Sequence, residues 1–126
     1  MSRLVLDAGA FIAFERGDGP MRARLAAARR KSLELITTSP VVAQVWRDGR
    51  RQVLLGLLIA ATRVEAPDDA AARRAGLLLA RSKTRDVVDA LLVGLARDGD
   101  TIITSDQRDI APLLVAARVR AAVLTV

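Results

Sequence analysis

The sequence contains no cysteine, no histidine and no tyrosine, and these absences exclude several kinds of site. Without cysteine there are no disulfides or thiolate nucleophiles, and without histidine there is no Ser-His-Asp triad and no imidazole metal ligand. Aromatic residues are also scarce, because Phe11, Phe14 and Trp46 are the only ones, so base stacking on an aromatic platform is not the expected mode of nucleic-acid binding. Acid–base or metal chemistry must therefore rest on carboxylates, with help from hydroxyls, amides, lysine or arginine.

Long hydrophobic runs are missing as well. The longest uncharged stretches are residues 35–46 and 52–62, which are too short to span a bilayer. An acid already stands at position 7, so no apolar stretch for a signal peptide precedes it. We therefore expect a cytoplasmic protein without a membrane partner. The chain of 126 residues is long enough to fold as a single domain over 1–126.

The charge balance favours a polyanionic partner. The 20 basic residues outnumber the 14 acidic ones, which gives a net charge of +6. Nucleic acid is one partner that such a balance suggests, although many basic proteins bind none and any single basic cluster is more often a solvated helix face. The arginines that we consider candidates for contact with a nucleic-acid backbone are Arg47, Arg50, Arg51 and Arg85.

Strand and helix patterns alternate along the chain. Strands are predicted at 3–6, 34–38, 63–65, 101–104 and 119–126. Helices are predicted at 20–31, from Ser39 and Pro40 to about residue 60, from about 67, over 86–97 and from 106. Such alternation with short connections predicts an α/β domain around a mainly parallel sheet.

Acidic residues follow two of these strands directly. Asp7 comes after the first strand and Asp106 after the strand at 101–104. In open parallel sheets, ligands bind beyond the carboxyl ends of the strands. Each residue also has a simpler role available, because aspartate is among the best helix N-caps.

Asp86 and Asp89 are three residues apart on the helix predicted at 86–97. We expect Asp89 at the margin of an apolar face formed by Val87, Val88, Leu91 and Leu95. Taken alone, Asp86 more simply complements a helix N-terminus and Asp89 is more simply solvated. The remaining aspartates that we assign to solvated faces or turns are Asp48, Asp68, Asp69, Asp98 and Asp100.

Several acids that converge without a basic partner repel one another. A hard divalent cation relieves that repulsion, and oxygen ligands suit Mg²⁺ or Mn²⁺. Together with a basic surface, such a site predicts attack of water on a phosphodiester.

Four motifs, in this order, resemble the PIN-domain ribonucleases and in particular the VapC-type toxins of bacterial toxin–antitoxin pairs. The motifs are LVLDAGAFIA at 4–13, TSPVVAQV at 38–45, DVVDALL at 86–92 and IITSD at 102–106. The resemblance covers nearly the whole chain. It implies a three-layer α/β/α sandwich around the parallel sheet and metal-dependent endonucleolytic cleavage of RNA. It also implies a cognate antitoxin that occupies the active-site groove, and a homodimer.

The resemblance also implies roles for individual residues. Asp7, Asp89 and Asp106 would form the catalytic acidic site that holds Mg²⁺ or Mn²⁺. The auxiliary residues would be the polar neighbours Thr104 and Ser105 and the further acids Asp86 and Asp109.

One position departs from the family pattern. The family's second acid, usually a glutamate in the helix after the second strand, is Gln44 here. An amide oxygen can still ligate a metal but brings no charge, so we expect weaker metal affinity and lower activity. Asp48, one turn further along the same predicted helix, is a possible substitute.

Two other classes of function stay open. The first is a catalytically weakened PIN-like module that binds RNA or a protein partner, which Gln44 favours. The second is a phospho-acceptor signalling domain, but that fold needs two adjacent acids after the first strand and a lysine after the last strand, and neither is present. No glycine-rich loop followed by lysine supports a nucleotide site.

Overall fold

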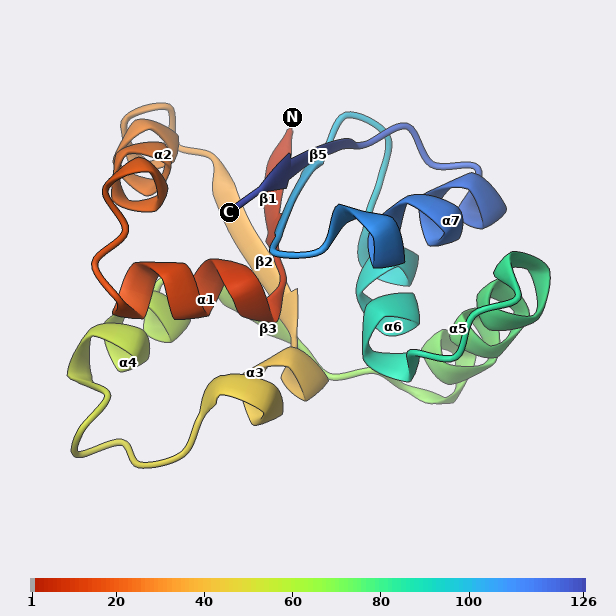
Figure 1. The fold of residues 1–126 in the computed structure, drawn as a ribbon, viewed down its shortest axis with the longest axis horizontal. Coiled ribbons are helices and arrows are strands. Elements are labelled where there is room, and N and C mark those ends of the chain that lie inside the picture. The colour runs from red at the N-terminus through yellow and green to blue at the C-terminus, as the bar shows by residue number, and fades with distance from the viewer. Residues whose placement is uncertain (1) are drawn as a thin grey trace.

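Five strands form one parallel sheet at the centre of the computed structural model, which describes residues 2–126 (Figure 1). The strands are β1 (Arg3–Leu6), β2 (Glu34–Thr38), β3 (Arg63–Glu65), β4 (Thr101–Thr104) and β5 (Ala122–Thr125). Their order in the sheet is β3-β2-β1-β4-β5, so β1 lies in the middle. Every neighbouring pair is parallel, so all carboxyl ends meet at one edge.

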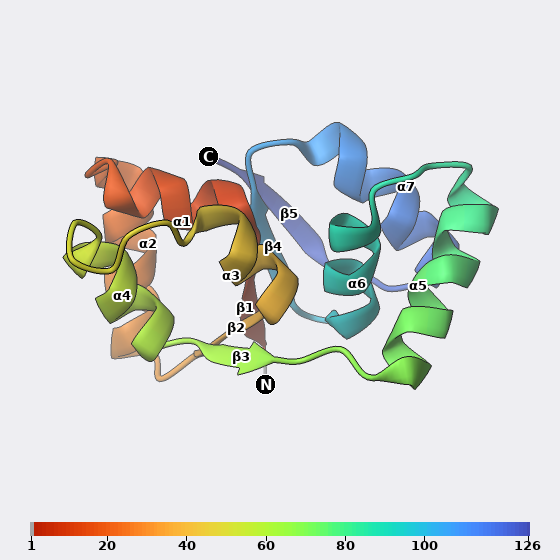
Figure 2. The same ribbon diagram turned by 90° about the horizontal axis from the view of Figure 1, so that it is seen from below.

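Helices cover both faces of the sheet. They are α1 (Ala8–Glu15), α2 (Gly19–Arg30), α3 (Ser39–Val45), α4 (Val53–Ala60), α5 (Asp69–Ser82), α6 (Val87–Leu95) and α7 (Gln107–Ala117). Figures 1 and 2 show α1, α2 and α4 on one face and α5, α6 and α7 on the other, with α3 at the carboxyl end of the sheet. The predicted three-layer α/β/α sandwich is therefore confirmed.

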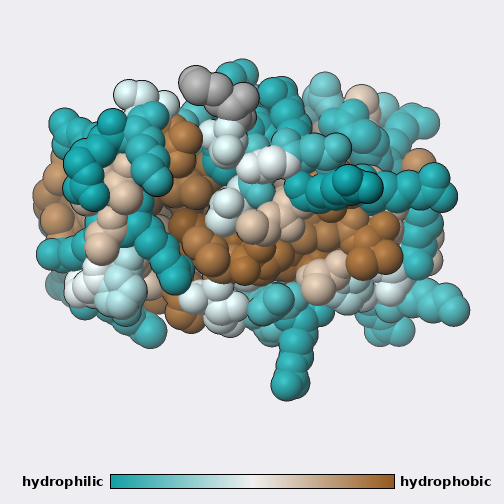
Figure 3. All heavy atoms as spheres, turned by 90° about the horizontal axis from the view of Figure 1, so that it is seen from above, coloured by the Kyte–Doolittle hydropathy of each residue, from teal (hydrophilic) through white to brown (hydrophobic). Residues whose placement is uncertain are grey.

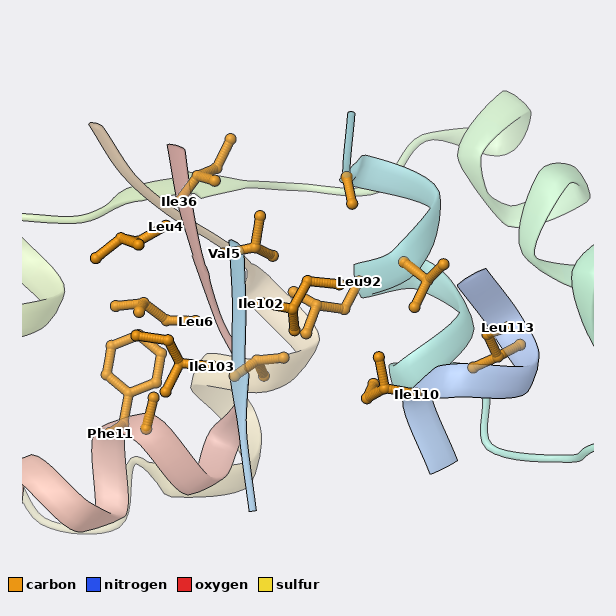
Figure 4. Packing of buried hydrophobic residues seen from close by; sticks show 14 of the residues in the cluster. Leu4, Val5, Leu6, Phe11, Ile36, Leu92, Ile102, Ile103, Ile110 and Leu113 are labelled. Carbon is orange, nitrogen blue, oxygen red and sulfur yellow. The ribbon is translucent and has the colours of Figure 1, made fainter. Parts of the chain in front are cut away.

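The central strands are apolar on both sides, as a sheet between two helical layers requires. All four residues of β1 are buried. Figure 4 shows Leu4 and Leu6 on the side of Phe11 from α1, and Val5 on the side of Leu92 from α6. One part of the hydrophobic core therefore lies between the sheet and α1, and another part lies between the sheet and α6.

The single helix predicted from residue 39 to about residue 60 is wrong. Helix α3 ends at Val45, because Trp46 has an extended backbone with φ −80° and ψ 127°. The side chain of Gln52 then holds the connection, since its Oε1 accepts the amides of Arg47 (2.7 Å) and Asp48 (2.9 Å) and its Nε2 donates to the carbonyl of Val45 (2.9 Å). A polar side chain that bonds the backbone in this way competes with helix continuation.

The structure differs from the sequence analysis at two further helices. Helix α1 was not predicted at all, although its N-cap is Asp7. Helix α6 also buries a different face from the one expected, because Val87 is 55% exposed and the buried residues are Asp89, Ala90, Leu92 and Val93. Among residues 2–126, no helix is long and apolar enough to cross a membrane.

Asp100 also differs from the expectation, because it is buried rather than solvated. Its Oδ2 lies 2.7 Å from an Arg3 guanidinium nitrogen, and its two oxygens also accept the amides of Arg3 (3.2 Å) and Arg97 (2.8 Å). Burial alone raises the pKa of Asp100, but the hydrogen bonds from Arg3 and Arg97 outweigh it and hold this pKa below its ordinary value. The pair joins the start of β1 to the start of β4.

Candidate active site

Asp7 lies at the carboxyl end of β1 and is 8% exposed. Its amide donates to the carbonyl of Ile103 (3.0 Å), which extends the pairing of β1 with β4 by one residue. Its Oδ1 accepts the amide of Ala8 (2.8 Å) at the start of α1. Asp7 is therefore the helix N-cap that its position allowed, and the cap fixes its carboxylate at the edge of the sheet.

Thr104 orients the other oxygen of Asp7. This threonine is fully buried at the end of β4, and its Oγ1 donates to Asp7 Oδ2 (2.7 Å). The same Oγ1 accepts the backbone amide of Asp106 (3.1 Å). One chain of hydrogen bonds thus links the ends of both central strands.

Asp89 is on the buried face of α6 and is 9% exposed. Burial, followed by the negative charges of four other aspartates, raises its pKa from 3.8 to about 7. Those four, in decreasing order of effect, are Asp7, Asp86, Asp109 and Asp106. The fold therefore brings together the five aspartates that the sequence pointed to.

The three exposed members of this cluster lie at helix starts. Asp86 caps α6, where its Oδ1 accepts the amide of Asp89 (3.0 Å). Asp106 caps α7, where its Oδ1 accepts the amide of Arg108 (3.0 Å). Asp109 is in the first turn of α7, and its pKa is raised by desolvation and then by the negative charge of Asp106. Capping and membership of the cluster are thus compatible roles.

The chemistry of these side chains fits a hard divalent cation. All donors are oxygens, and Asp89, whose pKa is raised first by burial and then by four neighbouring aspartates, lies in a concentration of negative charge that a cation would neutralise. Within residues 2–126, however, no three acidic side chains already surround a common point as metal ligands. The residues that would hold Mg²⁺ or Mn²⁺ are Asp7, Asp89 and Asp106, whose carboxylates would have to turn toward the ion.

Helix α3 brings no carboxylate to the cluster. Gln44 is exposed, and its side chain makes no hydrogen bond within the part of the chain that the structure describes. Asp48 does not replace it, because α3 has already ended at Val45. Asp48 instead accepts the amide of Arg50 (3.1 Å) in the connection to α4. The prediction that Asp48 lies one turn further along the same helix is therefore wrong.

Two small residues pack at the edge of the cluster. Ser105 is exposed between β4 and α7, and Gly9 on α1 lies against it. A Cβ atom at Gly9 would be 2.6 Å from Ser105 Cβ and 2.7 Å from its amide nitrogen. We did not single out Gly9 from the sequence, because only this close approach shows why a side chain is excluded there.

The four candidate arginines are all exposed. Arg47, Arg50 and Arg51 lie in the connection between α3 and α4, which runs along the bottom of Figure 1 below α1. The guanidinium groups of Arg50 and Arg51 make only long contacts with Asp48, at 3.6 and 3.9 Å. Arg85 directly precedes Asp86. Arg47 donates to the carbonyls of Ala43 (2.9 Å) and Trp46 (2.7 Å). Among residues 2–126, none of the four side chains is in a close ion pair, so their positive charges are not neutralised within the protein.

Comparison with known proteins agrees with this geometry. The family model described as the PIN domain matches residues 4–111. A chain in the crystal structure of DNA-bound VapBC from Salmonella typhimurium is similar in fold, with a TM-score of 0.73, 18% identity, and 98% of each chain covered. A chain of VapBC2 from Rickettsia felis, bound to a promoter DNA fragment, has a TM-score of 0.71 and 11% identity, with 98% of this chain and 99% of that chain covered. No curated protein sequence matches the chain. Because the PIN model spans most of the sequence, the chain belongs to the PIN-domain family.

Proposed function

We propose that this protein is a metal-dependent endoribonuclease, the VapC-like toxin of a type II toxin–antitoxin pair that acts in the cytoplasm. The observation that carries the proposal is the cluster of five aspartates at the carboxyl end of a PIN-family sheet, with Asp89 buried and its pKa raised to about 7. Repulsion among these carboxylates lowers the stability of the folded protein when they are ionised, and binding of a cation would offset this repulsion.

In this proposal Asp7, Asp89 and Asp106 hold Mg²⁺ or Mn²⁺. When bound, the cation supplies charge neutralisation at the scissile phosphate and a lowered pKa for a coordinated water. Thr104 and the Ala8 amide keep the Asp7 carboxylate oriented before any ligand binds. The carboxylate of Asp109, whose pKa is raised, is suited to accept a proton from the attacking water.

The exposed arginines would hold the RNA by its phosphates. Contacts of this kind give affinity but little sequence information. Since the chain has three aromatic residues and none of them is in the aspartate cluster, recognition would depend on RNA shape and splayed loops rather than on base stacking.

A protein partner is part of the proposal. The two similar solved chains come from VapBC assemblies, which supports a cognate antitoxin for this chain. A cavity of about 650 Å³ lies between α1, α2, β2 and α4, and its lining is mainly apolar. Leu57 borders this cavity and is 62% exposed, so burying it on a partner would be favourable.

We also propose that the protein forms a homodimer.

The proposal is tested by incubating purified protein and its Asp7→Asn variant with total RNA in Mn²⁺, Mg²⁺ or EDTA. We expect discrete fragments that require the metal and disappear in the variant, because one ligand charge is lost while the cap oxygen remains. Asp68→Asn is the matched control, since Asp68 also caps a helix but is exposed and outside the cluster. Equal cleavage by the Asp7→Asn variant and the parent would refute the assignment.

The second candidate function is a module that binds RNA or a protein without cleaving RNA, and the exposed neutral Gln44 favours it. Gln44→Glu would restore a carboxylate on α3, and we expect tighter Mn²⁺ binding and faster cleavage. Ala43→Glu adds the same charge at the neighbouring exposed position and serves as the control. If Gln44→Glu changes neither Mn²⁺ affinity nor cleavage rate, then the missing charge at position 44 does not limit metal binding or activity.

A further inference from the structure

Thr38, the last residue of β2, has a buried hydroxyl without a hydrogen-bond partner. The residue is 2% exposed, and its Oγ1 is the one buried side-chain nitrogen or oxygen among residues 2–126 that lacks a partner. Thr38 is also the N-cap of α3, yet its side chain makes no capping bond. By contrast, the neighbouring Thr37 donates its hydroxyl to the carbonyl of Leu6 (2.6 Å).

The strand register places Thr38 beside Asp7. Val5 pairs with Ile36, so the same parallel register, continued by two residues, pairs Asp7 with Thr38. On the other side of β1, Leu6 pairs with Ile103, and one residue further Asp7 is opposite Thr104. Paired residues of parallel strands point to the same face of a sheet. Thr38, Asp7 and Thr104 thus form one row across three strands, with the carboxylate in the middle.

This row is on the face of the sheet that α6 covers. Two residues earlier on the same face, Val5 and Ile102 point toward Leu92 of α6, as Figure 4 shows. Helix α6 also packs on β2 and on α3, and it carries Asp89 on its buried face. Thr38 therefore belongs to the same end and the same face of the sheet as the two buried aspartates.

An unpaired buried hydroxyl destabilises a fold. Valine has nearly the same shape as threonine, is at least as favourable in a strand and would remove this cost. Thr104 shows how a hydroxyl in this row is used, because it donates to Asp7. By the strand register, Thr38 is the equivalent residue on the other side of Asp7, at the start of α3, the helix in which Gln44 brings no charge.

We propose that Thr38 is a positioning residue of the cation site, whose hydroxyl oxygen accepts a hydrogen bond from a water on the divalent cation held by Asp7 and Asp89. The inference rests on the cation binding of the proposed function but not on RNA cleavage. It gives the unpaired hydroxyl its partner, and it supplies a neutral oxygen on the side of the site that lacks the family's glutamate.

The test is Mn²⁺ titration of the whole protein by calorimetry, together with thermal melting of the metal-free protein, for Thr38→Val and Thr38→Ser. We expect Thr38→Val to melt at or above the temperature of the parent and to bind Mn²⁺ about 3- to 10-fold more weakly, as loss of one hydrogen bond predicts. Thr38→Ser keeps the hydroxyl and should bind as the parent does. Thr37→Val is the matched control, because it removes a satisfied hydroxyl and should lower the melting temperature without changing Mn²⁺ affinity.

Two results would overturn the inference: an unchanged Mn²⁺ affinity for Thr38→Val, or a loss of metal-free stability as large as that of Thr37→Val. A parent that binds Mn²⁺ but cleaves no RNA contradicts the proposed nuclease, and the affinities of the variants then still decide the role of Thr38. A parent that binds no Mn²⁺ overturns both.

Discussion

Asp89 affects stability and the proposed cation binding in opposite directions. Its side chain has the place of a core residue on α6, with Leu92 and Val93 on the same buried face. Burial and the surrounding acids together raise its pKa to about 7. An ionised carboxylate in this place destabilises the metal-free fold, and the same concentration of charge favours a cation.

The first prediction concerns the pH dependence of metal-free stability. Because the folded pKa of Asp89 is raised, its stabilising contribution is fully present below its ordinary value near 3.8 and is lost as the pH rises through about 7. Urea unfolding of the parent in EDTA should therefore show lower stability at pH 8 than at pH 5. Asp89→Asn should lose much of this slope and, at pH 8, should exceed the parent by on the order of 2 kcal/mol.

Mn²⁺ at pH 8 should restore stability to the parent but not to Asp89→Asn, since a ligand stabilises the state that binds it. The exposed variant Asp68→Asn should keep the slope of the parent and provides the control. Identical slopes for the parent and for Asp89→Asn would show that Asp89 is not the titrating group.

The start of α1 and the connection from β4 to α7 are the two elements that shape the cluster. Asp7 and Asp106 cap their respective helices, and the hydroxyl of Thr104 joins them. The close approach of Gly9 to Ser105 lets the two segments meet. The spacing between these helix starts therefore sets the spacing of the carboxylates.

The second prediction is that Gly9→Ala pushes these elements apart. The new Cβ would be 2.6 Å from Ser105 Cβ and 2.7 Å from its backbone nitrogen, so the connection has to move. We expect a loss of about 1–3 kcal/mol in the free energy of unfolding, together with weaker Mn²⁺ binding. Denaturant unfolding and calorimetry measure the two effects.

Gly76→Ala on α5 is the control, because a Cβ there meets nothing within 4 Å. Alanine is the better helix former, so this control should be neutral or slightly stabilising. A Gly9→Ala protein as stable as the parent, with unchanged Mn²⁺ affinity, would mean that the contact relaxes at no cost.

On the scale of the whole molecule, the aspartates at the two ends of the sheet differ in their partners. Among residues 2–126, those at the carboxyl end have no hydrogen bond or ion pair with a basic side chain, whereas at the amino end the buried Asp100 is paired with Arg3. Arg3 also donates to the carbonyl of Leu95 (3.0 Å), so this pair joins β1, β4 and the end of α6. Between hydrophilic margins, a hydrophobic band crosses the face seen from the amino ends (Figure 3).

The third prediction is that the amino-end pair stabilises the fold without affecting the site. Asp100→Ala leaves the Arg3 guanidinium, whose side chain is 8% exposed, buried without its partner and should cost about 3–5 kcal/mol. Because the pKa of Asp100 is lowered, its contribution is present above its ordinary value near 3.8 and is lost as the pH falls through the folded pKa. Urea unfolding at pH 7 and at pH 3 checks both statements.

Asp69→Ala is the comparison, since it breaks an exposed pair with Arg73 in which both side chains are 80% exposed. Its cost should stay below about 1 kcal/mol. Mn²⁺ affinity at 25 °C should be unchanged in both variants. A large change in Asp100→Ala would mean that the two ends of the sheet are coupled.

The sequence alone determined the architecture and the acidic residues to examine. Alternating strand and helix patterns with short connections leave few α/β arrangements, and the strand at 63–65 and the one at 101–104 lie where they were predicted. Asp7 and Asp106 were recognisable because strand ends and helix caps have local signals. Local patterns failed where a side-chain hydrogen bond from outside the helix determines where that helix ends. Helix α3 ends at Val45, and the side chain of Gln52, seven residues later, bonds the carbonyl of Val45.

The family resemblance named the five aspartates, whereas only the tertiary structure decided how they act on one another. Nothing near Asp89 in the sequence reports that its side chain is buried or that four other acids raise its pKa, because most of them come from other elements. The same holds for the close contact at Gly9, for the buried pair of Asp100 with Arg3, and for the unpaired hydroxyl of Thr38. Secondary structure depends on residues a few positions apart, whereas burial, charge and hydrogen-bond satisfaction depend on neighbours that only the folded chain brings together.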